Sequence, residues 1–213
     1  MTILLDGIFI ALILLNFLIL GKASLHGVIR VVSVQGVALG LLPLLLSAHL
    51  HLRLGLVVLA TIALKGIVLP RMLVRALEEL SIRREVEPYI SFPASLVLGA
   101  LGTAFAMLVS HHLPLTPGPQ SDLLTSASLA TVLTGFLVLT TRRKALTQVL
   151  GYLVLENGVF IFGLLLLEPL PFLVEMGVLL DLFVAIFVMG VVIHHINREF
   201  ATESTERLTA LKD

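Results

Sequence analysis

Residues Leu54–Ala76 read LGLVVLATIALKGIVLPRMLVRA, a mainly apolar run with one lysine, Lys65, at its middle. A helix rises about 1.5 Å per residue, so a run of this length crosses a hydrocarbon layer roughly 30 Å thick. The stretch therefore predicts a membrane-spanning helix with an ionisable side chain inside it.

Runs of the same kind fill most of the chain. Hydrophobic residues make up 58% of the sequence and charged residues only 13%, whereas soluble domains contain about 25% charged residues. The predicted spans are Ile3–Leu20, Gly27–Ala48, Leu54–Ala76, Tyr89–His111, Asp122–Thr141, Ala145–Leu167 and Phe172–Ile196. They indicate an all-α fold, a polytopic transmembrane bundle of about seven helices.

The charges that flank these spans predict the orientation, because Lys and Arg accumulate on the cytoplasmic side of a membrane. Outside the spans' apolar centres, one side holds only Arg53. The other side holds Lys22, Arg30, Arg71, Arg75, Arg83, Arg84, Arg142, Arg143, Lys144, Arg198, Arg207 and Lys212. The N-terminus is thus expected outside and the C-terminus in the cytoplasm.

The spans divide the chain into three predicted parts. Residues 1–112 form a four-helix membrane segment, residues 122–197 a three-helix segment, and residues 198–213 a short cytoplasmic tail. Cysteine is absent, which excludes thiolate-held metal centres, and the histidines show no pattern that would gather them round a metal. No cofactor or metal is expected in this chain, and without a basic cluster carrying aromatics no nucleic acid is expected as a partner.

Three ionisable residues lie deep inside predicted spans: Lys65, Glu156 and Asp181. Such groups cost about 2.5–3.5 kcal/mol each on insertion scales, so they are functional candidates. From the cytoplasmic helix ends their depths are about 16, 16 and 22 Å, which predicts one central layer.

A lysine opposite a carboxylate, with a second carboxylate about a turn away, can pass a proton. Burial disfavours the charged carboxylate and a nearby ammonium favours it, and this opposition suits a group that must take and release a proton. The alternative is a static ion pair that orients helices. Weaker candidates are Asp6 and Glu175 near the outer face, and the amides Gln35, Gln148 and Asn157, which can bridge charged groups or bond neighbouring helices.

Pro70 follows Lys65 by five residues and has no N–H group to donate to the carbonyl of Gly66. The gap would let this helix bend and admit water beside the lysine. A plain kink without water is the other interpretation.

Several stretches resemble the E component of hydrogenase-4, a membrane subunit of group 4 nickel–iron hydrogenases. They are Arg142–Gly158, Leu173–Gly177, Asp181, the spacing of Phe183 and Ala185, Val188–Met189, Leu64–Pro70 and Leu208–Lys212. The likeness extends over most of the chain and is densest in its last third.

That last third is also similar to the three-helix K subunit of respiratory complex I and to the C subunit of Mrp-type sodium/proton antiporters. The first membrane glutamate of the K subunit corresponds here to Leu153, one helical turn from Glu156, and the second corresponds to Asp181. Because residues three apart share a helix face, Glu156 can still point toward the same neighbour.

The resemblance implies a non-catalytic subunit of an oxidoreductase complex in a bacterial or archaeal cytoplasmic membrane. It implies antiporter-like membrane subunits, a complex-I-like anchor subunit and a soluble hydrogenase or redox arm as partners. Proton translocation through Glu156, Asp181 and Lys65 is the leading hypothesis. The alternatives are a subunit of an Mrp-type cation/proton antiporter and a non-conducting structural subunit.

Overall fold

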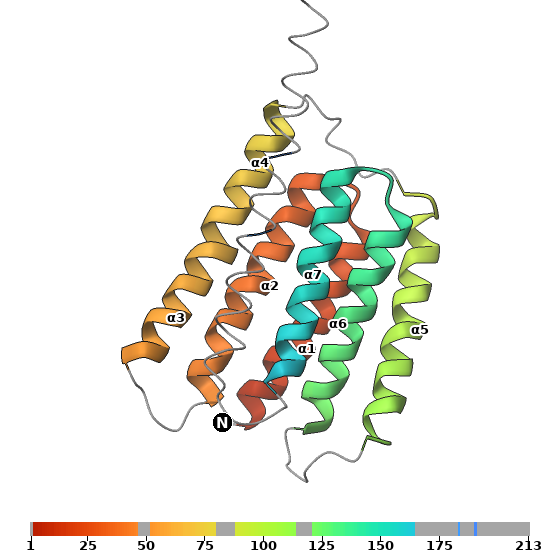
Figure 1. Cartoon of the computed structure of the whole chain (residues 1–213). Coiled ribbons are helices and arrows are strands. Elements are labelled where there is room, and N and C mark those ends of the chain that lie inside the picture. The colour runs from red at the N-terminus through yellow and green to blue at the C-terminus, as the bar shows by residue number, and fades with distance from the viewer. Residues whose placement is uncertain are drawn as a thin grey trace, which may run out of the picture.

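The computed structural model describes residues 2–46, 52–79, 88–113 and 121–164, together with the single residues 183 and 190. Within these ranges the chain forms a bundle of long helices (Figure 1). The helices are α1 (Thr2–Gly21), α2 (Leu25–Leu46), α3 (Leu52–Ala63), a π-helical segment η1 (Leu64–Val68), α4 (Leu69–Glu79), α5 (Phe92–Ser110), α6 (Ser121–Thr141) and α7 (Ala145–Gly163).

Six spans in the described part are long and apolar enough to cross a membrane, with α3, η1 and α4 contributing to a single span. They correspond to the first six predicted spans, so the all-α transmembrane bundle is confirmed. The seventh predicted span, Phe172–Ile196, lies outside the described ranges except for the single residues 183 and 190, and the predicted tail lies wholly outside them. The division into segments 1–112 and 122–197 stays a prediction.

The helix ends differ by a few residues from the predicted ones. The fourth span was predicted to begin at Tyr89, but α5 begins at Phe92 because Ser91 caps it. The Ser91 hydroxyl accepts a hydrogen bond from the N–H of Ala94, and Pro93 occupies the first turn, where a missing N–H costs nothing.

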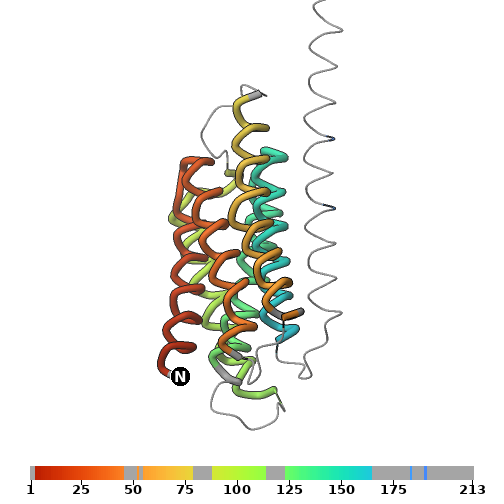
Figure 2. Tube along the Cα trace, turned by 90° about the vertical axis from the view of Figure 1, so that its left-hand side faces the viewer, coloured from red at the N-terminus to blue at the C-terminus, as the bar shows by residue number. Residues whose placement is uncertain are grey.

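Successive spans run in opposite directions, with α3, η1 and α4 forming one of these spans, as Figures 1 and 2 show. The turn from α1 to α2 and the turn from α6 to α7 therefore meet at the same end of the bundle. We name this the basic end, since Lys22, Arg142, Arg143 and Lys144 lie in those two turns. It is the side that the charge distribution predicts to face the cytoplasm.

The two helices α6 and α7 approach closely because glycines face the opposing backbone. A Cβ atom on Gly135 would lie 2.6 Å from the Cα of Leu155, and one on Gly158 would lie 2.6 Å from the backbone N of Val132. The hydroxyl of Ser128 donates to the Gly158 carbonyl across the same contact, at 2.9 Å. This tight pair fixes the position of α7, which carries Glu156.

The interior is divided into two apolar clusters. One gathers near the basic end and includes Leu20, Val28, Leu73 and Leu150. The other gathers toward the opposite end and includes Phe9, Leu42, Leu124 and Ile161. Along each of α1, α2, α6 and α7 the change from one cluster to the other falls at buried polar residues, namely Asn16, Gln35, Thr131 and the pair Glu156 and Asn157. A polar layer thus separates two apolar cores.

Candidate functional site

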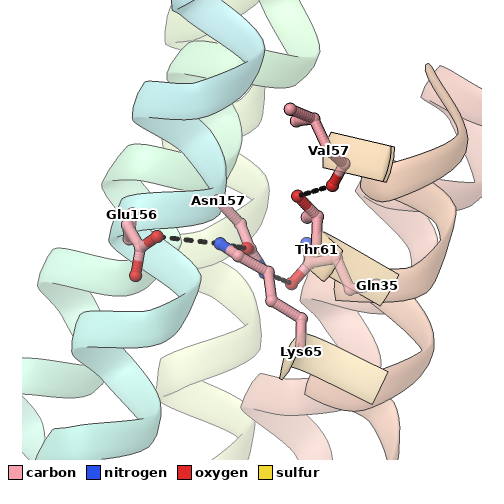
Figure 3. A network of polar contacts seen from close by, with 6 residues as sticks. All are labelled: Gln35, Val57, Thr61, Lys65, Glu156 and Asn157. Atoms are coloured by element: carbon pink, nitrogen blue, oxygen red, sulfur yellow. Dashed lines mark hydrogen bonds and ion pairs between the residues drawn. The ribbon is translucent and has the colours of Figure 1, made fainter. Parts of the chain in front are cut away.

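The polar layer is centred on an ion pair between Lys65 and Glu156. The Nζ atom of Lys65, from η1, lies 2.8 Å from Oε1 of Glu156, from α7 (Figure 3). The exposed fractions of the two residues are 8% and 3%. The sequence placed these residues at equal depth in separate spans, and the structure brings them into direct contact.

The backbone around Lys65 is adapted to this contact. In η1 the N–H of Leu69 donates to the carbonyl of Leu64, five residues earlier instead of four. Pro70 has no N–H group to donate to the carbonyl of Gly66. This carbonyl instead accepts a hydrogen bond of 3.1 Å from the hydroxyl of Ser33 on α2. The disturbance predicted at Pro70 therefore takes the form of a π-helical segment, a feature frequent at functional sites.

Space for the lysine stem comes from α2. A Cβ atom on Gly36 would lie 2.8 Å from the Cβ of Lys65, closer than real Cβ atoms approach. Only glycine at this position lets the lysine side chain pass between α2 and α7 without a shift. The Lys65 ammonium also lies 6.0 Å from the centre of the Phe160 ring, at the limit of a cation–π contact.

A chain of side-chain amides continues from Lys65 through the bundle. The Lys65 ammonium donates to Oδ1 of Asn157 at 3.0 Å, and Nδ2 of Asn157 donates to Oε1 of Gln35 at 3.4 Å. The amide of Gln35 then donates to Oδ1 of Asn16 at 2.9 Å. The amide of Asn16 in turn donates to the hydroxyl of Thr131, also at 2.9 Å.

In each hydrogen bond of this chain the residue nearer to Lys65 is the donor and the next residue is the acceptor. The last one, the Thr131 hydroxyl, donates to the backbone carbonyl of Ala127 at 2.6 Å. Such a chain stabilises the ammonium, because hydrogen bonds in series polarise one another. Amide groups hold their protons at neutral pH, so they orient the lysine and do not carry its proton onward.

Only one oxygen of the Glu156 carboxylate is used by the described residues. Its Oε2 atom is buried and has no hydrogen-bond partner among them. A buried acceptor without a partner is costly in proteins. The site therefore holds an ammonium and a carboxylate in hydrogen-bond contact, with one carboxylate oxygen available to a further group.

Of the other predicted site residues, Asn157 belongs to the site and Gln35 joins it, whereas two lie elsewhere. Gln148 donates to the backbone carbonyl of Arg142 at 3.2 Å, at the basic end. Asp6, in the first turns of α1, has a buried Oδ1 atom with no hydrogen-bond partner among the described residues. Asp181 and Glu175 lie outside the described ranges, so their placement stays a prediction.

Asn16 and Thr131 were not among the predicted site residues. Asn16 interrupts the apolar run of the first span, a signal of the same kind that singled out Lys65. Thr131 gives no comparable signal, because threonine bonds readily to its own helix and is tolerated in apolar spans. Its place in the amide chain follows only from the packing of α1 against α6.

A second buried cation, Arg142, was predicted only as part of the cytoplasmic charge. It is 1% exposed. Its Nη2 atom donates to the carbonyl of Leu20 at 3.1 Å and lies 3.5 Å from the hydroxyl of Ser95, and its guanidinium lies 5.2 Å from the centre of the Phe92 ring. Burial lowers the pKa of Arg142 from its ordinary value, yet a guanidinium remains protonated in proteins.

Metal ligation finds no support in the described part of the chain. No group of three or more histidines, aspartates and glutamates gathers there. The described site is thus a buried ion pair between Lys65 and Glu156, held in a polar layer of a multi-pass membrane protein.

Comparison with known proteins gives one relative along nearly the whole chain. The chain is 34% identical to the uncharacterized protein Rv0085 of Mycobacterium tuberculosis strain H37Rv over 206 residues, which is 95% of this chain and 93% of the relative. The chain belongs to the family of that protein. No protein-family model matches the sequence, and no solved structure does.

A second similarity covers half of the chain. Over 100 residues the chain is 35% identical to hydrogenase-4 component E of Escherichia coli K12, and the same figures hold for the component E of Shigella flexneri. The match spans 47% of this chain and 45% of each relative. This is less than the coverage of most of the chain that the sequence motifs suggested.

Proposed function

We propose that this chain is a membrane-arm subunit of a complex-I-like energy-converting complex of the group 4 hydrogenase type, in which the Lys65–Glu156 pair transfers protons. The observation that carries the proposal is the 2.8 Å contact between a buried ammonium and a buried carboxylate inside membrane-spanning helices. The similarity to hydrogenase-4 component E supports the type of complex.

The chemistry requires a proton to move between two bases in contact. When Nζ of Lys65 gives a proton to Oε1 of Glu156, an N–H bond is replaced by an O–H bond and both groups become neutral. Neutral groups are favoured in a low-dielectric layer, while the amide chain and the opposite charge favour the ionised pair. Rotation of this carboxyl about its Cγ–Cδ bond carries the new O–H group to the position that Oε2 now occupies, and from there the proton can pass on; Asp181 is the acceptor that the sequence suggests.

The competing function is a structural subunit. The same polar layer joins α1, α2, η1, α6 and α7 through side-chain hydrogen bonds, and a fixed network of this kind can set helix positions without conducting. A charged pair is nevertheless a poor device for stability alone, since apolar residues of similar volume are often at least as stabilising.

The first experiment identifies the complex. An affinity tag on this chain is used to isolate the native assembly from membranes, and mass spectrometry identifies its companions. Antiporter-like subunits, an anchor subunit and a soluble hydrogenase or redox arm are expected. Isolation with antiporter subunits and no redox arm would contradict the hydrogenase type.

The second experiment replaces Glu156 with Gln, which keeps its shape and cannot ionise. In sealed vesicles with matched complex content, proton movement driven by the electron donor of the complex is expected to fall by about tenfold or more. The control is Glu78→Gln, which removes an exposed carboxylate on α4 and is expected to pump normally. Pumping by Glu156→Gln at the rate of the unmodified complex would leave the structural function standing.

A further inference from the structure

A small cavity lies beside Lys65, between α2, the segment from η1 to α4, and α7. Its polar lining comes from Ser33, Lys65 and Asn157. Its volume is about 10 Å³, the room that a single water molecule needs, and a buried water needs two to four polar partners of this kind. The cavity therefore has the size and the lining of a water site.

The local sequence explains why the cavity is there. Gly36 leaves room for the lysine stem beside α2, and Pro70 follows the π-helical segment η1 on the other side; both residues line the cavity. The Ser33 hydroxyl donates to the Gly66 carbonyl, and its oxygen keeps lone pairs that can accept a hydrogen bond from water.

The described residues that line the cavity lie at the level of Lys65 or toward one end of the bundle. Its lining includes Ile29, four residues before Ser33 in α2, and Leu73, eight residues after Lys65 in α4. Both positions lie toward the basic end, where α2 begins and α4 ends. The cavity holds about one water and does not itself reach the end of the bundle, but its described lining lies at the level of Lys65 and on the side of the basic end.

We propose that this cavity is a water site through which the basic end supplies protons to Lys65, with Ser33 as a further residue of the pathway. After Lys65 has given a proton to Glu156, its neutral amine takes one proton from the aqueous phase through this water and becomes an ammonium again. The role in proton supply rests on the proposed function, whereas the access of water to Ser33 is a property of the fold.

The test uses the absence of cysteine from the chain. Single-cysteine variants Ser33→Cys and Ile29→Cys are exposed to silver ions in sealed vesicles of either orientation. Silver ions are small, water-borne and thiol-reactive, and unreacted thiols are afterwards alkylated in denaturant and counted by mass spectrometry. Both variants are expected to react from the basic end at least about tenfold faster than from the other side, because a thiol reacts only where water reaches it.

Two neighbours on α2 provide matched controls. Val31→Cys places a thiol in the apolar core outside the cavity, and Val34→Cys places one on the outward face, where the native valine is 52% exposed. Both are expected to react slowly in the intact membrane. Ser33→Cys and Ile29→Cys that react no faster than Val31→Cys, or react faster from the end opposite the basic one, would overturn the proposal.

The labelling experiment tests the water site separately from the proposed function, which is tested by pumping in Glu156→Gln. Fast labelling of Ser33→Cys together with normal pumping by Glu156→Gln would keep the water site and reject the proton-transfer function. Slow labelling together with a loss of pumping in Glu156→Gln would reject the water route and keep the function. If Ser33→Cys is labelled fast and Glu156→Gln loses pumping, Ser33→Ala is expected to lower the pumping rate several-fold. Thr140→Val, which removes a hydroxyl bonded to its own helix, is expected to leave the pumping rate unchanged.

Discussion

Lys65 and Arg142 are both cations buried inside the bundle, and they are held in opposite ways. Lys65 contacts a carboxylate and lines a cavity of the size of a water molecule. Arg142 contacts a backbone carbonyl, a hydroxyl and an aromatic ring, and Nη1 of its guanidinium has no hydrogen-bond partner among the described residues.

The difference follows from the chemistry of the two side chains. A lysine ammonium is able to lose its proton, whereas an arginine keeps its charge and offers a rigid planar fork of donors. Arg142 also lies near the C-terminal ends of α1 and α6, where helix dipoles favour a positive charge. The central cation is thus suited to the proposed proton transfer, and the cation at the basic end to holding helices together.

The largest loss in the free energy of unfolding is expected when Lys65 of the central ion pair is replaced. Lys65→Met leaves the Glu156 carboxylate buried without its cation and is expected to lower the free energy of unfolding by about 3–5 kcal/mol. The double variant Lys65→Met, Glu156→Gln is expected to regain most of this loss. Thermal and denaturant unfolding of the protein in detergent measures both.

The control for this prediction is Lys22→Met, which removes an exposed ammonium and is expected to change stability little. A double variant as unstable as Lys65→Met would show that the lysine stabilises the fold through packing and not through its charge. The charge of Lys65 would then not distinguish its role from that of Arg142.

A smaller loss is expected at the basic end from Arg142→Lys. The charge is kept, but the guanidinium fork that reaches the Leu20 carbonyl and stacks on Phe92 is lost. The expected cost is about 2 kcal/mol in the free energy of unfolding. Proton movement per assembled complex is expected to stay unchanged, in contrast to variants of Glu156.

The reference variant is Arg143→Lys, because Arg143 is exposed and lies 4.7 Å from the Tyr89 ring. Its cost is expected to be a few tenths of a kcal/mol. If Arg142→Lys were as stable as Arg143→Lys, anchoring by the buried guanidinium would be refuted.

The smallest loss in the free energy of unfolding is expected from a change in the amide chain next to the central ion pair. Gln35→Met keeps the length of the side chain and removes two hydrogen bonds, one to Asn16 and one from Asn157. Because polar bonds between membrane helices contribute about 0.6 kcal/mol each, the loss is expected to be about 1 kcal/mol. The unfolding measurements used for Lys65→Met detect it.

Thr140→Val serves as the control, since Thr140 is exposed and, among the described residues, its hydroxyl bonds to carbonyls of its own helix. It is expected to have no measurable effect. A loss of several kcal/mol in Gln35→Met would instead mean that the amide chain, and not the ion pair, holds the centre of the bundle.

The sequence by itself determined the class of fold and the ionisable groups at membrane depth. Hydropathy and the length of a run are local properties, so six spans could be placed to within a few residues. Lys65 and Glu156 stood out for the same reason, because a charge inside an apolar run is visible without knowledge of its neighbours. The irregular backbone near Pro70 could also be predicted, since proline has no N–H donor wherever it occurs.

Only the tertiary structure decided which of these groups meet. Lys65 and Glu156 are separated by 91 residues and Gln35 and Asn157 by 122, and helix periodicity does not specify the rotation of one helix against another. Gln148 seemed equivalent to Asn157 in sequence but faces the basic end. In the sequence Arg142 is one of several cytoplasmic charges in a short basic turn. The packing of α1, α5 and α6 buries it, and burial depends on the neighbours and not on the residue alone.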